Sequence, residues 1–258
     1  MPAIIDADVH ISPTPQGGNS IAIDELLRRM DRCGVDKAVT WLQPPYVRSE
    51  IDAGNAYVVR AMRDHPDRIL GFGWADPNLG VERAIADARR AIDAGCYGVK
   101  LNGAQNGYPI DDPRLAMPVI AAIAETGAAL ALHVGADAPD FTHPSRVATI
   151  ARAFPELRIL VVHMGGAAFH DLSAAAIAVA REHPNLTLIG SAVRAIPILT
   201  AIRTLGAGRV CFGSDTPFEL MHVELAKYRA LLEDEISAAE LEMVLGGTVA
   251  RALRLQGT

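Results

Sequence analysis

The sequence predicts a (β/α)8 barrel, which is a closed sheet of eight parallel strands surrounded by helices. Short apolar runs alternate eight times with segments whose apolar residues recur at helical spacing. The length of 258 residues is typical of one such barrel, so we expect a single domain over residues 1–258. An open dinucleotide-binding sheet is disfavoured, because no G-x-G-x-x-G follows the first run and His10 stands there instead.

The eight expected strands are short and apolar, and polar or turn-forming residues follow them. In chain order they cover residues 3–9, 38–42, 69–74, 98–101, 129–133, 159–163, 186–189 and 210–212. Each strand brings its carboxyl end to the same face of the barrel, which is where active sites of this fold lie.

Amphipathic segments fill the intervals between the strands. In the first interval, Ile23, Leu26, Leu27, Met30 and Cys33 share one helical face. Further helices are expected over residues 55–64, 80–94, 115–126, 145–154, 167–183 and 196–205, with a C-terminal pair between residues 222 and 255. Because strand–helix–strand connections are right-handed, this alternation gives a parallel sheet that can close as a barrel.

Composition limits the function classes. A net charge of -6 disfavours nucleic acid as a partner. No run of 18 apolar residues predicts a membrane span. Three scattered cysteines form no disulfide framework, and the N-terminus lacks the features of a signal peptide, so a cytoplasmic location is expected. The expected partner is a small-molecule substrate.

Metal-type side chains end four of the expected strands. Asp8 and His10 end the first, His133 the fifth, His163 the sixth, and Asp215 the eighth. One such histidine alone is more often packed and hydrogen-bonded, but five donors at one rim favour an ion, because buried charges are costly unless paired or metal-bound. Imidazole nitrogen and carboxylate oxygen suit zinc or manganese. The pattern predicts one divalent cation, held by Asp8, His10, His133 and Asp215.

Other polar residues at this rim are candidates for supporting roles. Side-chain alternation places Asp6 on the face of Asp8 and His10, where it is expected to orient a neighbour. Lys100 ends the fourth strand and can bind a substrate carboxylate or pair with an aspartate. Three further candidates for substrate binding follow strands or lie in loops: Arg48, Arg194 and His143.

Six motifs are spread along the chain: IDADVH at 5–10, GVKL at 98–101, LH at 132–133, FPEL at 154–157, VHMGG at 162–166 and FGSDTP at 212–217. Together they resemble the amidohydrolase superfamily, in the branch that contains aminocarboxymuconate semialdehyde decarboxylase and aromatic acid decarboxylases. The resemblance covers nearly the whole chain. One departure is Asp8, where the family most often has the first histidine of His-x-His, and its carboxylate shifts the preference towards manganese or magnesium.

The resemblance implies that Asp8, His10, His133 and Asp215 are the metal ligands and that His163 and Asp215 move protons. Zinc is the expected ion and manganese the alternative. Binuclear relatives bridge two ions with a carbamylated lysine on strand four, so a second ion at Lys100 is a further alternative. Many relatives form homodimers, and a homodimer is expected by that association.

A metal-bound water and a neighbouring base favour hydrolysis of a small amide, ester or lactone as the expected reaction. Three alternatives stay open. The site could hold a small aromatic or muconate-type acid and protonate the carbon that loses carbon dioxide. A metal-free lactonase could use Asp215 alone to activate water. A barrel without catalysis could serve as a binding subunit.

Overall fold

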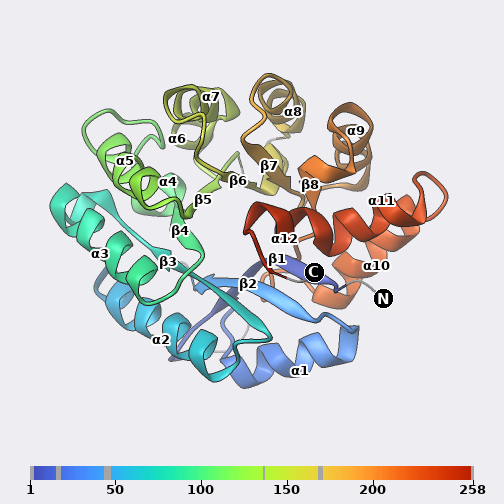
Figure 1. The fold of residues 1–258 in the computed structure, drawn as a ribbon, viewed down its shortest axis with the longest axis horizontal. Helices are drawn as coiled ribbons and strands as arrows, with labels where there is room; N and C mark the ends of the chain where they lie inside the picture. Colours follow the sequence, from blue (N-terminus) through green and yellow to red (C-terminus); the bar gives the residue numbers. More distant parts are fainter. Residues whose placement is uncertain (1–2, 16–18, 44–47, 136, 168–170, 257–258) are drawn as a thin grey trace.

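The computed structural model describes residues 3–15, 19–43, 48–135, 137–167 and 171–256. Eight strands form one sheet in the order β1 to β8, and each neighbouring pair is parallel. The strands are β1 (Ile5–Ile11), β2 (Lys37–Leu42), β3 (Ile69–Trp74), β4 (Gly98–Leu101), β5 (Ala129–His133), β6 (Ile159–Val162), β7 (Leu186–Ile189) and β8 (Val210–Cys211). The predicted (β/α)8 barrel is confirmed (Figure 1).

The barrel closes between β1 and the segment that follows β8. The amide of Ala7 donates to the carbonyl of Phe212 at 3.1 Å, and the amide of Asp215 donates to the carbonyl of Asp8 at 2.9 Å. The amide of His10 then donates to the carbonyl of Thr216 at 2.8 Å. These bonds form a seam that joins the first strand to the end of the eighth.

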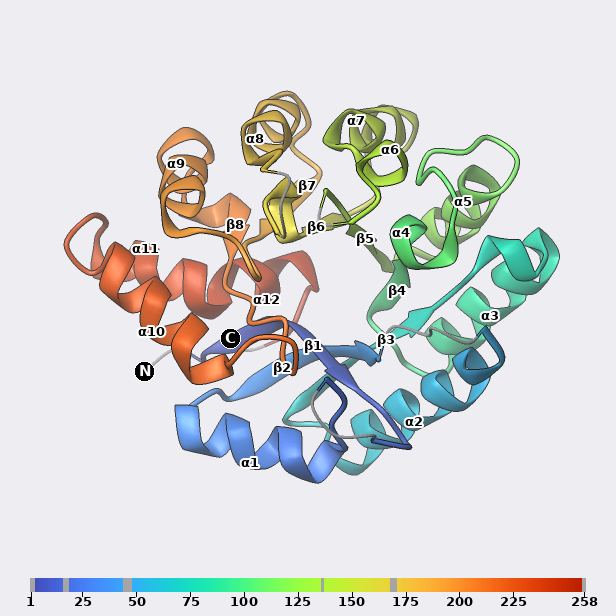
Figure 2. The same ribbon diagram turned by 180° about the vertical axis from the view of Figure 1, so that it is seen from behind.

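Helices surround the strands, most of them as an outer ring, and Figures 1 and 2 show this arrangement from opposite sides. They are α1 (Ile23–Cys33), α2 (Ile51–Asp64), α3 (Val81–Asp93), α4 (Gly103–Asn106), α5 (Ala116–Thr126), α6 (Pro139–Thr142), α7 (Pro144–Ala153), α8 (Ser173–Glu182), α9 (Ala195–Leu205), α10 (Met221–Leu232), α11 (Ala238–Glu242) and α12 (Thr248–Ala252). None of the helices described is both long and apolar enough to cross a lipid bilayer.

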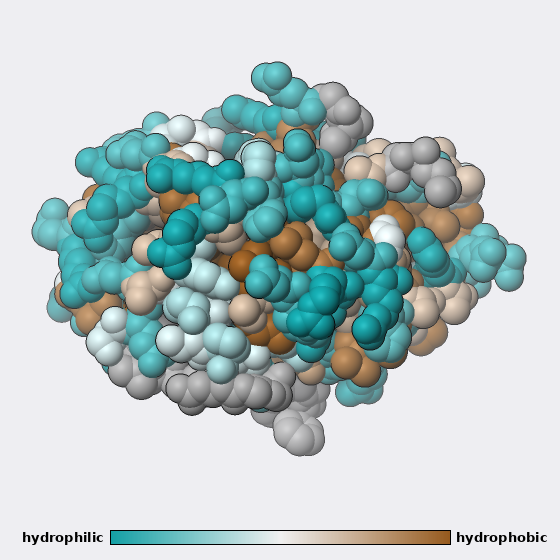
Figure 3. Space-filling view, turned by 90° about the horizontal axis from the view of Figure 1, so that it is seen from below, coloured by the Kyte–Doolittle hydropathy of each residue, from teal (hydrophilic) through white to brown (hydrophobic). Residues whose placement is uncertain are grey.

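Apolar side chains fill two separate regions. The barrel interior holds residues such as Val39, Leu70, Phe72 and Leu160, and Val249 of α12 packs onto the same cluster. A larger cluster lies between the sheet and the helices. On the side where α1 and α2 lie, Figure 3 shows many polar residues, with hydrophobic residues at the centre and towards the right of the view. The helices therefore bury their apolar faces against the sheet and turn polar faces outward.

Two predicted boundaries are wrong near the sixth strand. The strand ends at Val162 rather than His163, because His163 (φ 66°) and Met164 (φ 37°) have left-handed backbone and form a tight turn. The helix predicted over 167–183 begins only at Ser173, whose amide donates to the Asp171 side chain at 3.1 Å. Residues 168–170 lie outside the described part of the chain.

Candidate active site

A β-bulge in β1 determines which of its acidic residues enter the barrel. The register between β1 and β2 shifts between Asp6 and Val9. Ala7 packs with the interior cluster, whereas Val9 packs with the outer one. Asp8 and His10 therefore point into the barrel and Asp6 points outward. The prediction that all three share one face is wrong, because strict alternation does not survive a bulge.

Asp6 is fully buried behind the site and holds two segments together. Its Oδ1 accepts hydrogen bonds from the amides of Asp8 at 3.1 Å and Ser214 at 2.8 Å. Its Oδ2 has no hydrogen-bond partner among the described residues. Burial raises the pKa of Asp6 to about 7. Asp6 thus positions the backbone that carries Asp8 and Asp215.

Asp8, His10 and Asp215 form a compact cluster, in which one ligand atom of each lies within 4.8 Å of the others. His10 Nε2 lies 3.6 Å from Asp8 Oδ1 and 3.5 Å from Asp215 Oδ1. His10 Nδ1 donates to the carbonyl of Leu42 at 2.9 Å, which leaves Nε2 with a lone pair. Burial and the nearby charge of Lys100 lower the pKa of His10 to about 3, so the ring is neutral.

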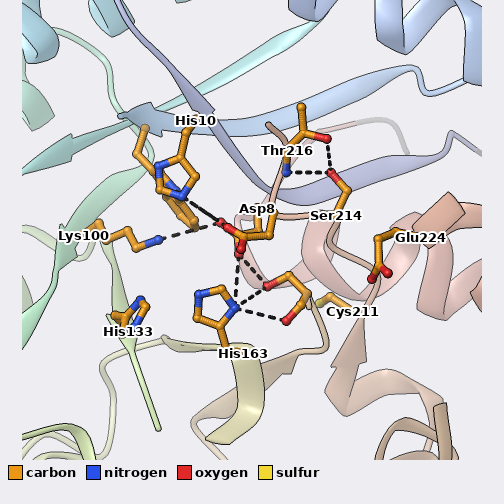
Figure 4. Close-up of polar contacts among 12 residues, drawn as sticks. Asp8, His10, Lys100, His133, His163, Cys211, Ser214, Thr216 and Glu224 are labelled. Carbon is orange, nitrogen blue, oxygen red and sulfur yellow. Dashed lines mark hydrogen bonds and ion pairs between the residues drawn. The ribbon is translucent and has the colours of Figure 1, made fainter. Parts of the chain in front are cut away.

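The Asp8 carboxylate lies at the centre of the site, and Figure 4 shows His10, Lys100 and His163 converging on it. The hydroxyl of Ser191 donates to Asp8 Oδ2 at 2.5 Å, and His163 Nδ1 lies 3.9 Å from the same oxygen. Lys100 Nζ lies 3.7 Å from Oδ1. Burial opposes ionisation of Asp8, but the charge of Lys100 and the hydrogen bond from Ser191 hold its pKa below the ordinary value.

The two histidines from strands five and six lie beside each other, with ring centroids 4.7 Å apart. His163 Nδ1 donates to the carbonyl of Ser191 at 3.1 Å, which leaves Nε2 for chemistry. His133 Nε2 is buried without a hydrogen-bond partner among the described residues, and burial lowers the pKa of this ring well below its ordinary value. His133 is not one of the three clustered residues, but its ring lies beside that of His163, whose Nδ1 is close to Asp8.

The donor set fits a divalent cation. Asp8 Oδ1 and His133 Nε2 are buried acceptors with no partner in the described structure, as expected where an ion belongs. Burial and the charge of Asp8 raise the pKa of Asp215 to about 7, the shift that paired carboxylates show without a cation. One contact competes with a bound ion for His10. Trp41 Nε1 donates to His10 Nε2 at 3.1 Å, and this hydrogen bond occupies the lone pair that an ion would need.

The candidate substrate residues are scattered. Arg48 donates to Asp76 at 2.5 Å and to the carbonyl of Asn106 at 2.7 Å, so it ties two loops together. Arg194 is exposed before α9. His143 accepts a hydrogen bond from the amide of Ser145 and lines a cavity of about 620 Å³ that no member of the metal cluster lines. Only Lys100 contacts that cluster, through Asp8.

Two residues of the site escaped sequence reasoning. Ser191 contacts both Asp8 and His163, and Phe218 packs edge-on against His10 at a centroid distance of 5.4 Å. Ser191 follows the seventh predicted strand by two residues, which was an available signal. A search restricted to metal-type donors passes over a hydroxyl.

Comparison with known proteins places the chain in context. Its sequence matches the family model described as Amidohydrolase over residues 5–255. No curated protein matches the sequence. Among solved structures it is similar to 5-carboxyvanillate decarboxylase from Sphingomonas paucimobilis, with 20% identity and a TM-score of 0.77, covering 98% of this chain and 99% of the other.

Two further structures are similar. For 2,6-dihydroxybenzoate decarboxylase from Rhizobium the identity is 19%, the TM-score is 0.77, and all of both chains is covered. For a dihydroxybenzoic acid decarboxylase from a Polaromonas species, solved with manganese and the inhibitor 2-nitroresorcinol, the values are 18% and 0.74, with 100% of this chain and 98% of the other covered. At these identities the likeness establishes the shared fold.

These comparisons correct the expected reaction. Hydrolysis was expected first and decarboxylation second, yet all three enzymes are named for decarboxylation. The expectation of hydrolysis is wrong, and its alternative is better supported. The donor residues did not predict the reaction correctly, because one set of carboxylates and imidazoles around a cation can either activate water or hold a substrate carboxylate. The donor set does not specify which bond breaks.

Proposed function

The chain belongs to the amidohydrolase family, whose model spans residues 5–255, and from this premise we propose that it is a metal-dependent decarboxylase of a small aromatic carboxylic acid. One observation carries the proposal. Asp8, His10 and Asp215 form a cluster that could hold a cation beside Lys100, a buried cationic side chain that can attract a carboxylate. The names of the structurally similar enzymes support this chemistry.

Asp8, His10 and Asp215 would hold the ion, with His133 as a further ligand. When bound, the ion supplies positive charge that attracts the anionic substrate. The reaction breaks the bond between the ring carbon and the carboxylate, releases carbon dioxide, and needs one proton at that carbon. We assign this proton to His163, because its Nδ1 is fixed by the Ser191 carbonyl and its Nε2 is available.

Asp215 is the second proton-handling group in this proposal. Its carboxylate lies in the donor cluster, where it can accept a proton and return it. We propose manganese as the ion, since two of the three clustered donors are carboxylates and the Polaromonas enzyme was solved with manganese. The zinc expected from the sequence is the competing ion. The expected homodimer and cytoplasmic location stay predictions.

The test measures carbon dioxide release after metal removal and reloading. Protein stripped with a chelator is loaded with manganese or zinc and incubated with 2,6-dihydroxybenzoate or 5-carboxyvanillate. We expect release with manganese, loss of release after stripping, and one deuterium on the product ring in heavy water. Ser173→Ala, which removes a buried hydroxyl on α8, is a matched control that keeps full activity. Well-folded, manganese-loaded protein that releases nothing from a panel of aromatic acids refutes the proposal.

A further inference from the structure

We infer that Lys100 is the anchor for one substrate carboxylate and that it makes the site select a carboxylate over a neutral amide of the same shape. This inference rests on the proposed function and specifies its substrate class. It starts from the position of the Lys100 ammonium group, which is fully buried at the centre of the barrel.

Lys100 Nζ has no hydrogen-bond partner among the described residues. The carboxylate oxygen of Asp8 lies 3.7 Å away, which is beyond hydrogen-bond length. A buried amine without an acceptor is costly, so natural proteins rarely leave one unpaired. Asp8 Oδ1 is also unpartnered, and an ion can satisfy it. An ion cannot satisfy Lys100 Nζ, which needs an acceptor.

Two indole rings hold the lysine in this position. Its Nζ lies 3.8 Å from the centroid of the Trp41 ring and 5.9 Å from that of Trp74. Trp41 packs edge-on against Phe72 at a centroid distance of 5.7 Å, and Trp74 donates to the side chain of Asn106 at 3.0 Å. Aromatic faces attract an ammonium group but accept no conventional hydrogen bond. The cage therefore orients the amine and leaves its N–H groups for a ligand.

A substrate carboxylate supplies the acceptor that Lys100 lacks, because its oxygens can receive the N–H groups that the indole rings leave unpaired. A neutral amide offers one weaker acceptor oxygen. The position of Lys100 therefore favours a carboxylate over an amide of the same shape.

Intrinsic fluorescence tests the inference directly, because Trp41 and Trp74 are the chain's only 2 tryptophans and both flank Lys100. Manganese-loaded protein is titrated with benzoate, and with benzamide as a neutral probe of the same shape. We expect wild-type protein to bind benzoate at least about tenfold more tightly than benzamide. Lys100→Met should lose this preference, with benzoate weakened to the level of benzamide.

Lys37→Met is the matched control, since Lys37 begins β2 at the opposite end of the barrel and donates to the carbonyl of Asp67. Benzoate binding should be unchanged in this variant. If Lys100→Met does not fold, Lys100→Gln removes the charge and keeps a polar side chain, and the same loss is expected. Unchanged benzoate preference in either folded variant overturns the inference.

Benzoate binding requires no turnover, so the two proposals fail separately. A Lys100-dependent preference in manganese-loaded protein that releases no carbon dioxide from any acid refutes the decarboxylase proposal and supports the anchor. Carbon dioxide release together with unchanged benzoate preference in Lys100→Met supports the decarboxylase and refutes the anchor.

Discussion

The two ends of the barrel interior differ sharply, although the same strands build both. Towards the amino ends of the strands, Val39, Leu70 and Phe72 pack with Val249 of α12 in a fully apolar cluster. Towards the carboxyl ends, the interior is occupied by charged and imidazole side chains, and several of their polar atoms have no partner among the described residues. The apolar end, at the amino ends of the strands, stabilises the fold. The polar end, at their carboxyl ends, lowers the stability of the fold and keeps donor atoms available for ligands.

Asp215→Asn is expected to have the largest effect on function. Asparagine fits the left-handed backbone at this position (φ 58°), so the fold should survive. Decarboxylation should fall about 10³-fold, because a metal ligand and a proton-handling group are lost together. Melting temperature of the metal-free variant at pH 8 should not fall, since a strained buried charge is removed. Carbon dioxide release and thermal unfolding measure the two effects. Near-wild-type activity would contradict the assigned role.

Phe72→Ala tests the opposite end of the barrel. The ring is fully buried and meets Trp41 edge-on at a centroid distance of 5.7 Å. Its removal should lower the free energy of unfolding by about 3–5 kcal/mol. Equilibrium unfolding in urea measures the loss, and Phe154→Ala at a half-buried position should cost clearly less. Equal losses at both positions would show that the interior cluster is not the main source of stability.

The pH dependence of stability separates Asp6 from the apolar end. The folded pKa of Asp6 is raised to about 7 by burial, above its value in the unfolded chain. The folded state therefore binds the proton more tightly. Its stabilising contribution, on the order of 4 kcal/mol, is complete at about pH 4 and is lost as pH rises from there to about 7. In Asp6→Asn this part of the slope should disappear from urea unfolding measured across the range. An unchanged slope would assign the dependence to other groups.

Ser191→Ala should have the smallest effect among the residues of the polar end. Its hydroxyl donates to Asp8 Oδ2, so its loss frees the carboxylate to rotate. Residues that orient a metal ligand typically contribute about 10–100-fold in metal affinity. Calorimetric titration with manganese measures this change, and Ser173→Ala on α8 should leave the affinity unchanged. If both serine variants bind manganese equally well, Ser191 has no role in orienting Asp8.

Sequence alone predicted the regular part of this molecule well, because apolar alternation and helical periodicity are local signals. It identified all eight strands and singled out Asp8, His10 and Asp215, which lie together in the structure. It failed where the direction of a side chain depends on the register between paired strands. The face of Asp6 depends on a shift in register against β2, which the sequence of β1 does not contain. The tie between Arg48 and Asp76 likewise depends on loop conformation.

The expected reaction was wrong for a different reason. Donor type and strand position establish that an ion can bind, but the bond that breaks depends on how the substrate lies against the donors. Lys100 illustrates this, because its position beside Asp8 and Trp41 became informative only in three dimensions. On the sequence it was one lysine at the end of a strand.

The seam of the barrel has a consequence for the ends of the chain. Backbone bonds from Ala7, His10 and Asp215 join the first strand to the segment after the last. An ion bound by both Asp8 and Asp215 would therefore link two residues that are separated by most of the sequence. Its effect would resemble that of a crosslink that closes a long loop and restricts the unfolded chain. Deuterium uptake at those three amides should then slow when manganese is added, while amides between β4 and β5 keep their rates.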